Sequence, residues 1–197
     1  NDPMLIVLSD TIFDADLTEM LNSEYSSIAV HKVDNPRRFG IVELEDGFIE
    51  RFIEKPDAPT SDLAIVGIYL IKNVQLLFES LEQIVEKDIR TRGEYQLTDA
   101  LQLMLNAGEK MRTFDIEGWY DCGTPETLLK TNRHLLEKGG EYREIPGSIV
   151  IPPVFIADSA VISNSIVGPY VSIASGSRVT NSIILDTIIN ENANIGN

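Results

Sequence analysis

Hydrophobic and polar positions follow two different patterns along the chain, and the change comes after Gly139-Gly140. Before it, short apolar runs that predict strands alternate with stretches of helical periodicity. The predicted strands are 5–8, 28–33, 41–44, 48–53, 64–71 and 110–116, and the predicted helices are 16–21, 74–87, 98–107 and 125–138. Alternating strands and helices indicate a layered α/β domain, and Asp46-Gly47 predicts a hairpin inserted into it.

Beyond residue 149 helical periodicity is lost, and aliphatic residues recur at spacings of five or six, separated by Ser, Asn, Asp and Gly. This period is typical of a β-solenoid, whose coils stack aliphatic side chains in columns, and a short β-sandwich tail is the alternative. The predicted column residues are Ile156, Ile162, Val167, Ile173, Val179, Ile184, Ile189 and Ile195. We therefore predict two domains, an α/β domain at 1–140 and a solenoid at 148–197.

Two acidic residues follow predicted strands and are candidate ligands. The run 5–8 is continuously apolar, which predicts a strand buried on both faces of a parallel sheet, and Asp10 comes directly after it. Ligands gather at the carboxyl ends of such strands, although a turn or capping role would also explain Asp10. Asp121 lies in a turn before a helix that Thr124 caps and that Gly139 should end in a left-handed cap. A bond to local backbone is the alternative for Asp121.

The pair Glu54-Lys55 stands at the end of a predicted strand. Pro56 ends the pairing and predicts an extended Lys55. The pair is either a solvated surface pair or a site in which Glu54 accepts sugar hydroxyls and Lys55 holds a phosphate. Gly67 interrupts the strand 64–71, which indicates a bulge or a close approach by a ligand or another segment.

Composition narrows the function classes. The 197 residues include 16 basic and 31 acidic ones, a net charge of −15, which argues against nucleic acid and against an anionic membrane as partners. No apolar run approaches the roughly 20 residues of a membrane span. The single Cys122 excludes an internal disulfide, so we expect a cytoplasmic location, and His31 and His134 are too few for a histidine-based zinc site. An anionic substrate would need local cations or a metal.

Six motifs together carry a family resemblance. They are Ser9-Asp10-Thr11-Ile12-Phe13, Arg38-Phe39-Gly40-Ile41-Val42-Glu43, Phe52-Ile53-Glu54-Lys55-Pro56, Val66-Gly67-Ile68-Tyr69, Arg92-Gly93-Glu94-Tyr95-Gln96-Leu97-Thr98-Asp99 and Trp119-Tyr120-Asp121-Cys122-Gly123-Thr124-Pro125-Glu126. In this order they resemble the sugar-1-phosphate nucleotidyltransferases, closest to the glucose-1-phosphate thymidylyltransferases. The solenoid resembles the left-handed β-helix of longer members. The resemblance implies an incomplete Rossmann-like nucleotidyltransferase domain followed by a short left-handed β-helix.

The resemblance also implies an activity and a site. Such enzymes make a nucleotide-sugar and pyrophosphate from a nucleoside triphosphate and a sugar-1-phosphate, here with dTTP or UTP and with glucose-1-phosphate as the default. N-acetylglucosamine-1-phosphate and mannose-1-phosphate are other possible sugars. Asp10 and Asp121 would hold the catalytic Mg²⁺. The implied sugar and phosphate contacts are Gly40, Glu54 and Gly67 for the sugar hydroxyls, Lys55 and Arg92 for the sugar phosphate, and Trp119 for a wall of the sugar site.

Two departures from the family motifs matter. Ser9 stands where the family usually has a glycine, and the chain lacks the glycine-rich G-x-G-T-R phosphate loop that belongs upstream of the Asp10 strand. We therefore expect little or no turnover, a piece of a longer protein, and an exposed sheet edge that, like the β-helix, could support a homo-oligomer. A non-catalytic regulatory or sugar-phosphate-binding relative is the alternative. A hexapeptide-repeat acyltransferase ranks third, because no histidine follows His134.

Overall fold

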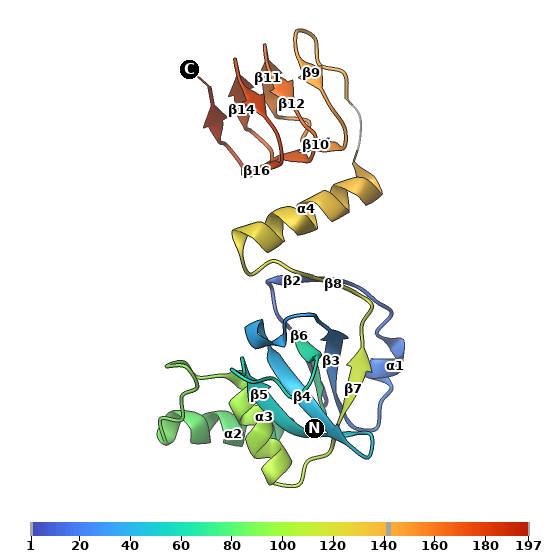
Figure 1. Cartoon of the computed structure of the whole chain (residues 1–197), viewed down its shortest axis with the longest axis vertical. Helices are drawn as coiled ribbons and strands as arrows, with labels where there is room; N and C mark the ends of the chain where they lie inside the picture. Colours follow the sequence, from blue (N-terminus) through green and yellow to red (C-terminus); the bar gives the residue numbers. More distant parts are fainter. Residues whose placement is uncertain (1, 141–142, 197) are drawn as a thin grey trace. The chain divides into compact units, whose positions relative to one another are not determined.

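The computed structural model describes residues 2–140 and 143–196, and the chain divides into two compact units between Trp119 and Tyr120 (Figure 1). This division places the last helix in the same unit as the β-helix. The two domains expected from the sequence, 1–140 and 148–197, remain a prediction. Within the described residues, no helix combines the length and the apolar composition needed to cross a bilayer.

The first unit is built on a mixed sheet. Its strands are β1 (Met4–Val7), β3 (Ser26–Lys32), β4 (Gly40–Glu45), β5 (Phe48–Glu54), β6 (Leu63–Ile71) and β7 (Met111–Asp115). The order is β5-β4-β6-β3-β7, and β1 pairs with β6. Only β3 and β7 run parallel; the other pairs are antiparallel, including the predicted hairpin β4–β5.

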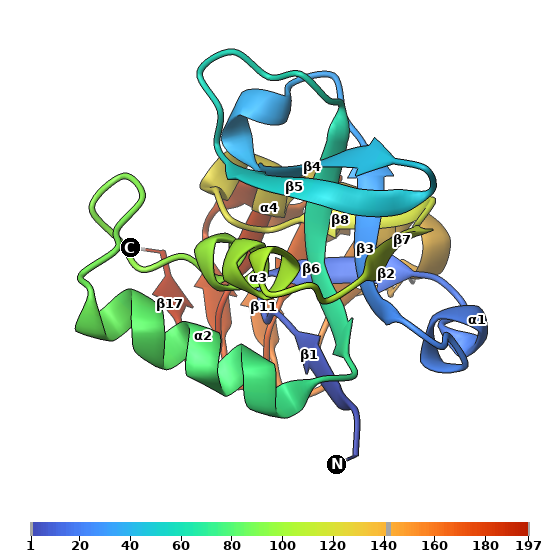
Figure 2. The ribbon, with the colours of Figure 1, turned by 90° about the horizontal axis from the view of Figure 1, so that it is seen from below.

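Helices cover both faces of this sheet. On one face α2 (Val74–Glu86) packs against α3 (Leu97–Asn106), and α3 lies along β5 (Figure 2). Their Leu77, Leu101 and Met104 are buried against Ile28 and Val30 of β3. The opposite face is covered by α1 (Thr18–Leu21) and by β2 (Thr11–Asp14), which pairs with β8 (Gly118–Asp121). The α/β layers predicted from the sequence are confirmed, and a short 3₁₀ helix, η1 (Pro36–Arg38), precedes β4.

The prediction for the first strand was wrong in its sheet type. Strand β1 runs antiparallel to β6, and its residues alternate between half-buried and exposed. Leu5 and Val7 are 43% and 47% exposed. A four-residue apolar run is compatible with one buried face or with two, because its composition does not show what covers the second face.

The second unit contains α4 (Pro125–Gly139) and a three-sided parallel β-helix. Its strands are β9 (Ile149–Val150), β10 (Val154–Ile156), β11 (Val161–Ser163), β12 (Ile166–Val167), β13 (Val171–Ile173), β14 (Arg178–Thr180), β15 (Ile183–Ile184), β16 (Thr187–Ile189) and β17 (Asn194–Ile195). They form the sheets β15-β12-β9, β10-β13-β16 and β11-β14-β17. Val154 pairs with Val171, a step of 17 residues, and Val171 pairs with Thr187, a step of 16. The predicted left-handed β-helix class is confirmed.

The predicted aliphatic columns fill the interior of the β-helix. Most are buried, namely Ile162, Val167, Ile173, Val179 and Ile189, and Ile156 and Ile184 pack against them. Val154 and Val171 add a further buried pair. Ile195 in the last described coil is 36% exposed. Stacking places each inward side chain on the equivalent side chain of the next coil, and the spacing of five or six residues read from the sequence corresponds to one side of the three-sided coil.

The start of α4 agrees with the prediction and its end does not. The Thr124 side chain accepts a hydrogen bond from the Thr127 N–H, and Pro125 occupies the first turn. Gly139 lies inside the helix instead of capping it, and the cap residue Gly140 has a φ of −67°, which is not left-handed. A Cβ on Gly140 would lie 2.9 Å from the Pro153 Cβ. Glycine is needed there because the β-helix approaches closely.

Candidate active site

Glu54 lies opposite Gly40 across the β4–β5 pair. Its side chain is 9% exposed. The Thr98 hydroxyl donates to its Oε2 at 2.9 Å, and the Lys55 ammonium lies 3.7 Å from its Oε1. A Cβ at position 40 would lie 3.0 Å from the same Oε2. The pair therefore presents a carboxylate, which only accepts hydrogen bonds, beside a stretch of uncovered backbone.

Lys55 has a conformation that the sequence did not predict. Its φ is +42°, in the left-handed region, whereas Pro56 predicted an extended residue. Two backbone bonds hold it there: the Lys55 N–H donates to the Phe39 carbonyl at 3.0 Å, and the Lys55 carbonyl accepts from Arg92 at 2.6 Å. The strain is therefore maintained by tertiary contacts. The ammonium turns toward Glu54 and is 43% exposed.

Arg92 meets this strand end from the loop between α2 and α3. Its φ is also positive, at +55°. Thr91 and Glu94 close the loop by exchanging two backbone hydrogen bonds. The guanidinium donates to the Lys55 carbonyl and to the Asp57 carboxylate at 2.7 Å, and it is 50% exposed. The structure thus brings the two predicted phosphate ligands together, with both cations accessible to an anion.

Two consecutive residues at the start of α3 organise this cluster, and the sequence analysis missed both. Thr98 binds Glu54, as described above. The Asp99 Oδ1 accepts from the Thr91 hydroxyl at 3.0 Å, and Asp99 Oδ2 is a buried atom without a partner in the described chain. A threonine and an aspartate in the first turn of a helix are usually explained as capping residues. Only the fold shows that they reach Glu54 and the loop of Arg92.

Trp119 lies next to the same region. Its indole N–H donates to the Thr11 hydroxyl at 2.6 Å, and its ring meets the Phe39 ring edge-on at 5.1 Å. Phe39 precedes Gly40 and its carbonyl holds Lys55. Trp119 therefore stands one aromatic ring from the Gly40–Glu54 pair, and its role as a wall of the sugar site remains a prediction.

Gly67 occupies a bulge in β6. Its φ is +84°, and the register between β3 and β6 shifts around it, from Ile28–Tyr69 to Val30–Ile65. The Leu8 N–H donates to the Gly67 carbonyl at 2.8 Å, and the Leu8 side chain would lie 3.1 Å from an added Cβ. Both explanations offered for this glycine apply, a bulge and a close approach by another segment. Direct contact with a sugar remains a prediction.

Asp10 is exposed in the turn between β1 and β2. Its charge reaches Tyr69, a residue that is 5% exposed on β6. Burial raises the pKa of the Tyr69 hydroxyl well above its usual value, and the carboxylates of Glu54 and Asp10 raise the pKa further. Two of the predicted site carboxylates therefore act on one buried phenol, and the place of Asp10 in the site remains a prediction.

Asp121 belongs to the second unit. It is partly buried, and its Oδ1 accepts from the Gly123 N–H at 2.9 Å, so the local backbone bond offered as the alternative is present. Because Asp10 and Asp121 lie in different units, their convergence on one ion stays a prediction. In the described ranges no three His, Cys, Asp or Glu side chains form a metal-binding group.

Comparison with known proteins decides the family. Residues 1–138 match the Nucleotidyl transferase family. The chain belongs to this family. It is 34% identical over 144 residues to the low-salt glycan biosynthesis nucleotidyltransferase Agl11 of Haloferax volcanii, covering 70% of this chain and 39% of the relative. It is 39% identical over 140 residues to the bifunctional protein GlmU of Methanocaldococcus jannaschii, covering 70% and 33%. The resemblance to sugar-1-phosphate nucleotidyltransferases is confirmed.

A solved structure shows the same fold. The crystal structure of a Bacillus anthracis protein described as a glucose-1-phosphate thymidylyltransferase, in complex with sucrose, superposes with a TM-score of 0.56 at 29% identity. The match covers 73% of this chain and 58% of that chain. Among the curated relatives named above, the match to this chain covers 39% and 33% of their own length, so the chain spans about a third of these proteins. The activity of the complete protein is accordingly treated as a proposal.

Proposed function

We propose that the complete gene product is a sugar-1-phosphate nucleotidyltransferase that forms a dTDP- or UDP-glucose type nucleotide-sugar and pyrophosphate. The observation that carries this proposal is the cluster of Glu54, Lys55 and Arg92 beside Gly40, found in a member of the nucleotidyl transferase family. A cytoplasmic location is part of the proposal, because the chain has a single cysteine.

The cluster has the chemistry that a sugar-1-phosphate needs. Sugar hydroxyls are donors, and the carboxylate of Glu54 offers two acceptor oxygens beside the small Gly40. The phosphate is an acceptor, and Lys55 and Arg92 supply charged donors at the same strand end. One neutral polyol and one dianion can thus be held side by side by groups of opposite character.

The reaction mainly requires that the sugar phosphate and the nucleoside triphosphate are held in the correct relative position. An oxygen of the sugar phosphate attacks the α-phosphorus of the nucleoside triphosphate, the new O–P bond forms, and the bond to pyrophosphate breaks. The attacking oxygen is already anionic, so no general base is required. Lys55 and Arg92 would orient this oxygen and reduce the repulsion between the two polyanions.

A magnesium ion would be held by Asp10 and Asp121. When bound, Mg²⁺ neutralises charge on the phosphates and on the departing pyrophosphate. The carboxylates are hard oxygen ligands of the type that this ion prefers. In our proposal the two residues share one ion, so removing either carboxylate should have an effect far larger than that of a surface charge.

The second candidate function is a sugar-phosphate-binding relative without turnover. Absence of the glycine-rich G-x-G-T-R loop from the complete gene product would favour it. Such a loop supplies the backbone N–H groups that hold a triphosphate. In this alternative the Glu54 cluster binds its ligand and no nucleotidyl transfer follows.

A pyrophosphate-release assay on the complete gene product separates the two. dTTP and UTP are each paired with glucose-1-phosphate, N-acetylglucosamine-1-phosphate and mannose-1-phosphate in the presence of Mg²⁺. We expect release with at least one pair, and loss of that release in Asp121→Ala. The matched control is Asp158→Ala, a fully exposed carboxylate of the same unit, which should keep normal turnover. Near-normal rates for Asp121→Ala would reject its metal role, and absence of release with every pair would favour the second function.

Direct binding tests the cluster independently of turnover. Titration calorimetry of the 197-residue chain with glucose-1-phosphate should show binding that Arg92→Ala weakens about tenfold or more, because one charged phosphate donor is lost. Arg51→Ala is the control, since Arg51 lies on the same strand as Glu54 and only pairs with Glu43 at 3.3 Å. Equal losses in the two variants would mean that overall charge, not the cluster, decides binding.

A further inference from the structure

The loop between α2 and α3 carries Arg92 on an unusual backbone. Three of its residues, Asp88, Arg92 and Gly93, have positive φ angles of +51°, +55° and +85°. Positive φ is unfavourable for a residue with a Cβ, so other contacts must maintain it at Asp88 and Arg92. In the proposed function Arg92 supplies a charged donor for the sugar phosphate. The contacts that fix this loop therefore decide where that donor lies.

Three side chains of the loop are bonded to one another in a closed set. The Arg90 Nε–H donates to the Asp88 Oδ1 at 2.6 Å, and the Tyr95 hydroxyl donates to the same oxygen at 2.7 Å. A second Arg90 nitrogen donates to the Tyr95 hydroxyl at 3.0 Å, and the guanidinium carbon lies 4.2 Å from the centre of the Tyr95 ring. We call these three residues the Arg90 cluster. Each member contacts both of the others, so removing one leaves a single link.

The Arg90 cluster is joined to the turn that carries Arg92. The third Arg90 nitrogen donates to the Gly93 carbonyl at 3.4 Å, so all three guanidinium nitrogens donate within this loop. The same turn is held from α3, where the Thr91 hydroxyl donates to Asp99 at 3.0 Å. Arg92 thus lies between two attachments, one on each side of it in the loop.

The Arg90 cluster is exposed and local. The side chains of Asp88 and Arg90 are 69% and 46% exposed, and Tyr95 is 40% exposed. Hydrogen bonds from Arg90 and from the Tyr95 hydroxyl lower the pKa of the Asp88 carboxyl, which keeps it ionised at neutral pH. Exposed ion pairs contribute little to the stability of a fold, and these contacts join residues of one loop only. Their effect should therefore fall on the conformation of the loop.

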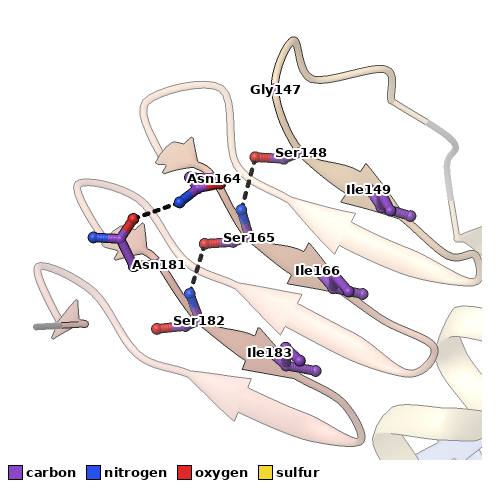
Figure 3. Close-up of a pocket in the computed structure, with 9 residues that line it drawn as sticks. All are labelled: Gly147, Ser148, Ile149, Asn164, Ser165, Ile166, Asn181, Ser182 and Ile183. Atoms are coloured by element: carbon purple, nitrogen blue, oxygen red, sulfur yellow. Dashed lines mark hydrogen bonds between the residues drawn. The ribbon is translucent and has the colours of Figure 1, made fainter.

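The hollow on the β-helix offers polar groups of a different kind (Figure 3). The Ser165 N–H donates to the Ser148 hydroxyl at 3.2 Å, and the Asn164 amide donates to the Asn181 side-chain carbonyl at 2.7 Å. Its lining residues include no charged side chain. Its sheet, β15-β12-β9, is separate from the sheet β10-β13-β16, whose Ser172 bonds to α4. Because this hollow lacks a cation, it has no charged donor for a phosphate.

We propose that Asp88, Arg90 and Tyr95 are positioning residues that fix Arg92 for the sugar phosphate before the ligand binds. This inference rests on the proposed function, in which Arg92 contacts that phosphate. A donor already held in its bound conformation loses less conformational entropy on binding, so the affinity is higher. The donors of Arg90 are used within the loop, so the cluster acts on the ligand through Arg92.

Titration calorimetry of the 197-residue chain with glucose-1-phosphate tests this through a double-mutant cycle. We expect Arg90→Ala and Tyr95→Phe each to weaken binding about three- to tenfold, and neither to weaken it further in an Arg92→Ala background. Tyr95→Phe leaves the charge of the chain unchanged, so its effect cannot come from net charge. The matched control is Arg143→Ala, which removes an arginine that is also 46% exposed and pairs with Asp158, and which should keep normal affinity. Circular dichroism checks folding.

Kinetics of the complete gene product give a second measurement. Arg90→Ala should raise KM for the sugar-1-phosphate and leave KM for the nucleoside triphosphate unchanged, because Arg92 serves only the first substrate in the proposal. A general loss of stability would change both.

The outcomes separate this inference from the proposed function. If Arg92→Ala weakens binding and neither Arg90→Ala nor Tyr95→Phe does, the positioning role is rejected and the proposed function stands. Equal losses with and without Arg92 would also reject it, since the cluster would then act on the ligand or on the fold directly. If Arg92→Ala leaves the affinity unchanged, the phosphate role of Arg92 fails, and the positioning role fails with it.

Discussion

The atoms around Gly40 explain why this position is a glycine. A Cβ at this position would lie 3.0 Å from the Glu54 Oε2 and 3.0 Å from the Thr98 Cγ2. Thr98 is itself bonded to that carboxylate oxygen, so neither neighbour can move without breaking the bond between them. At the residue scale, the proposed site depends on glycine at position 40, because a side chain there would occupy the space beside the Glu54 carboxylate.

Gly40→Ala should therefore damage the proposed sugar site more than the fold. We expect the added methyl to displace Glu54 and to raise KM for the sugar-1-phosphate about tenfold, with a loss of about 1–3 kcal/mol in the free energy of unfolding from overpacking. Steady-state kinetics of the complete gene product and urea unfolding measure the two effects. Gly139→Ala is the control, because no described atom outside its own helix backbone lies within 4 Å of its added Cβ. An unchanged KM in Gly40→Ala would remove Gly40 from the site.

Tyr69 gives a prediction on pH. Burial raises the pKa of its hydroxyl, and Glu54 and Asp10 act in the same direction. The unfolded chain then releases the phenolic proton first, near pH 10. The stability that Tyr69 contributes is therefore complete below about pH 10 and is lost as the pH rises above it.

Tyr69→Phe should reduce this alkaline loss. Urea midpoints measured between about pH 8 and pH 10.5 should fall less in the variant than in the wild type, because the variant has no phenol to ionise. Parallel curves for the two proteins would show that Tyr69 does not govern the alkaline transition.

At the scale of elements, α4 is attached to the β-helix through polar contacts. The residues it buries are Thr131, Asn132 and Leu136, whereas Leu128 and Leu135 are more than 40% exposed. Asn132 accepts from the Ser172 hydroxyl at 2.6 Å and donates to the Tyr170 carbonyl at 3.4 Å. The helical pattern predicted α4 correctly. Its leucines do not mark the side that packs against the β-helix, because two of them are exposed.

Asn132→Ala should destabilise the second unit by about 1–3 kcal/mol, because it leaves the half-buried Ser172 hydroxyl without its acceptor. Ser172→Ala should cost less, and the double variant should cost less than the sum of the two. Circular dichroism follows the whole unfolding reaction, whereas fluorescence of Trp119, the single tryptophan, reports the first unit. Additive costs, or a shift confined to the fluorescence transition, would contradict a direct Asn132–Ser172 contribution.

At the scale of the whole molecule, the residues of the proposal are divided between the two units. The sugar-phosphate cluster of Glu54, Lys55 and Arg92 lies entirely in the first, and Asp121 lies in the second. In our proposal, binding of a sugar phosphate and formation of a nucleotide-sugar are therefore separable. The first needs groups that one unit contains, and the second also needs both carboxylates and a means of holding the triphosphate.

The 197-residue chain should accordingly bind and not react. We expect glucose-1-phosphate to bind by calorimetry, and pyrophosphate release to be at least about 10³-fold slower than in the complete gene product, because the donors of a glycine-rich loop are absent from this sequence. Turnover within tenfold of the complete protein would show that such a loop is dispensable.

Repeating patterns account for the parts of the fold that could be predicted. The aliphatic period after residue 149 predicted the β-helix, helical periodicity over 74–87 predicted α2, and Asp46-Gly47 predicted the hairpin. Each of these signals is local, since it depends on neighbours within one turn or one coil. The left-handed Lys55 was missed because its conformation is held by Phe39 and Arg92, which are distant in sequence.

The sequence by itself determined the family, the order of the elements and the residue types available for a sugar phosphate. These could be predicted because motifs and hydrophobic periodicity depend on residues that are close together in the sequence. Only the tertiary structure decided that Glu54, Lys55, Arg92, Thr98 and Asp99 share one strand end, and that one side of the β-helix is uncharged and uncovered by α4. The physical reason is that such contacts join segments distant in sequence, whose meeting depends on the packing of the whole sheet and of every coil.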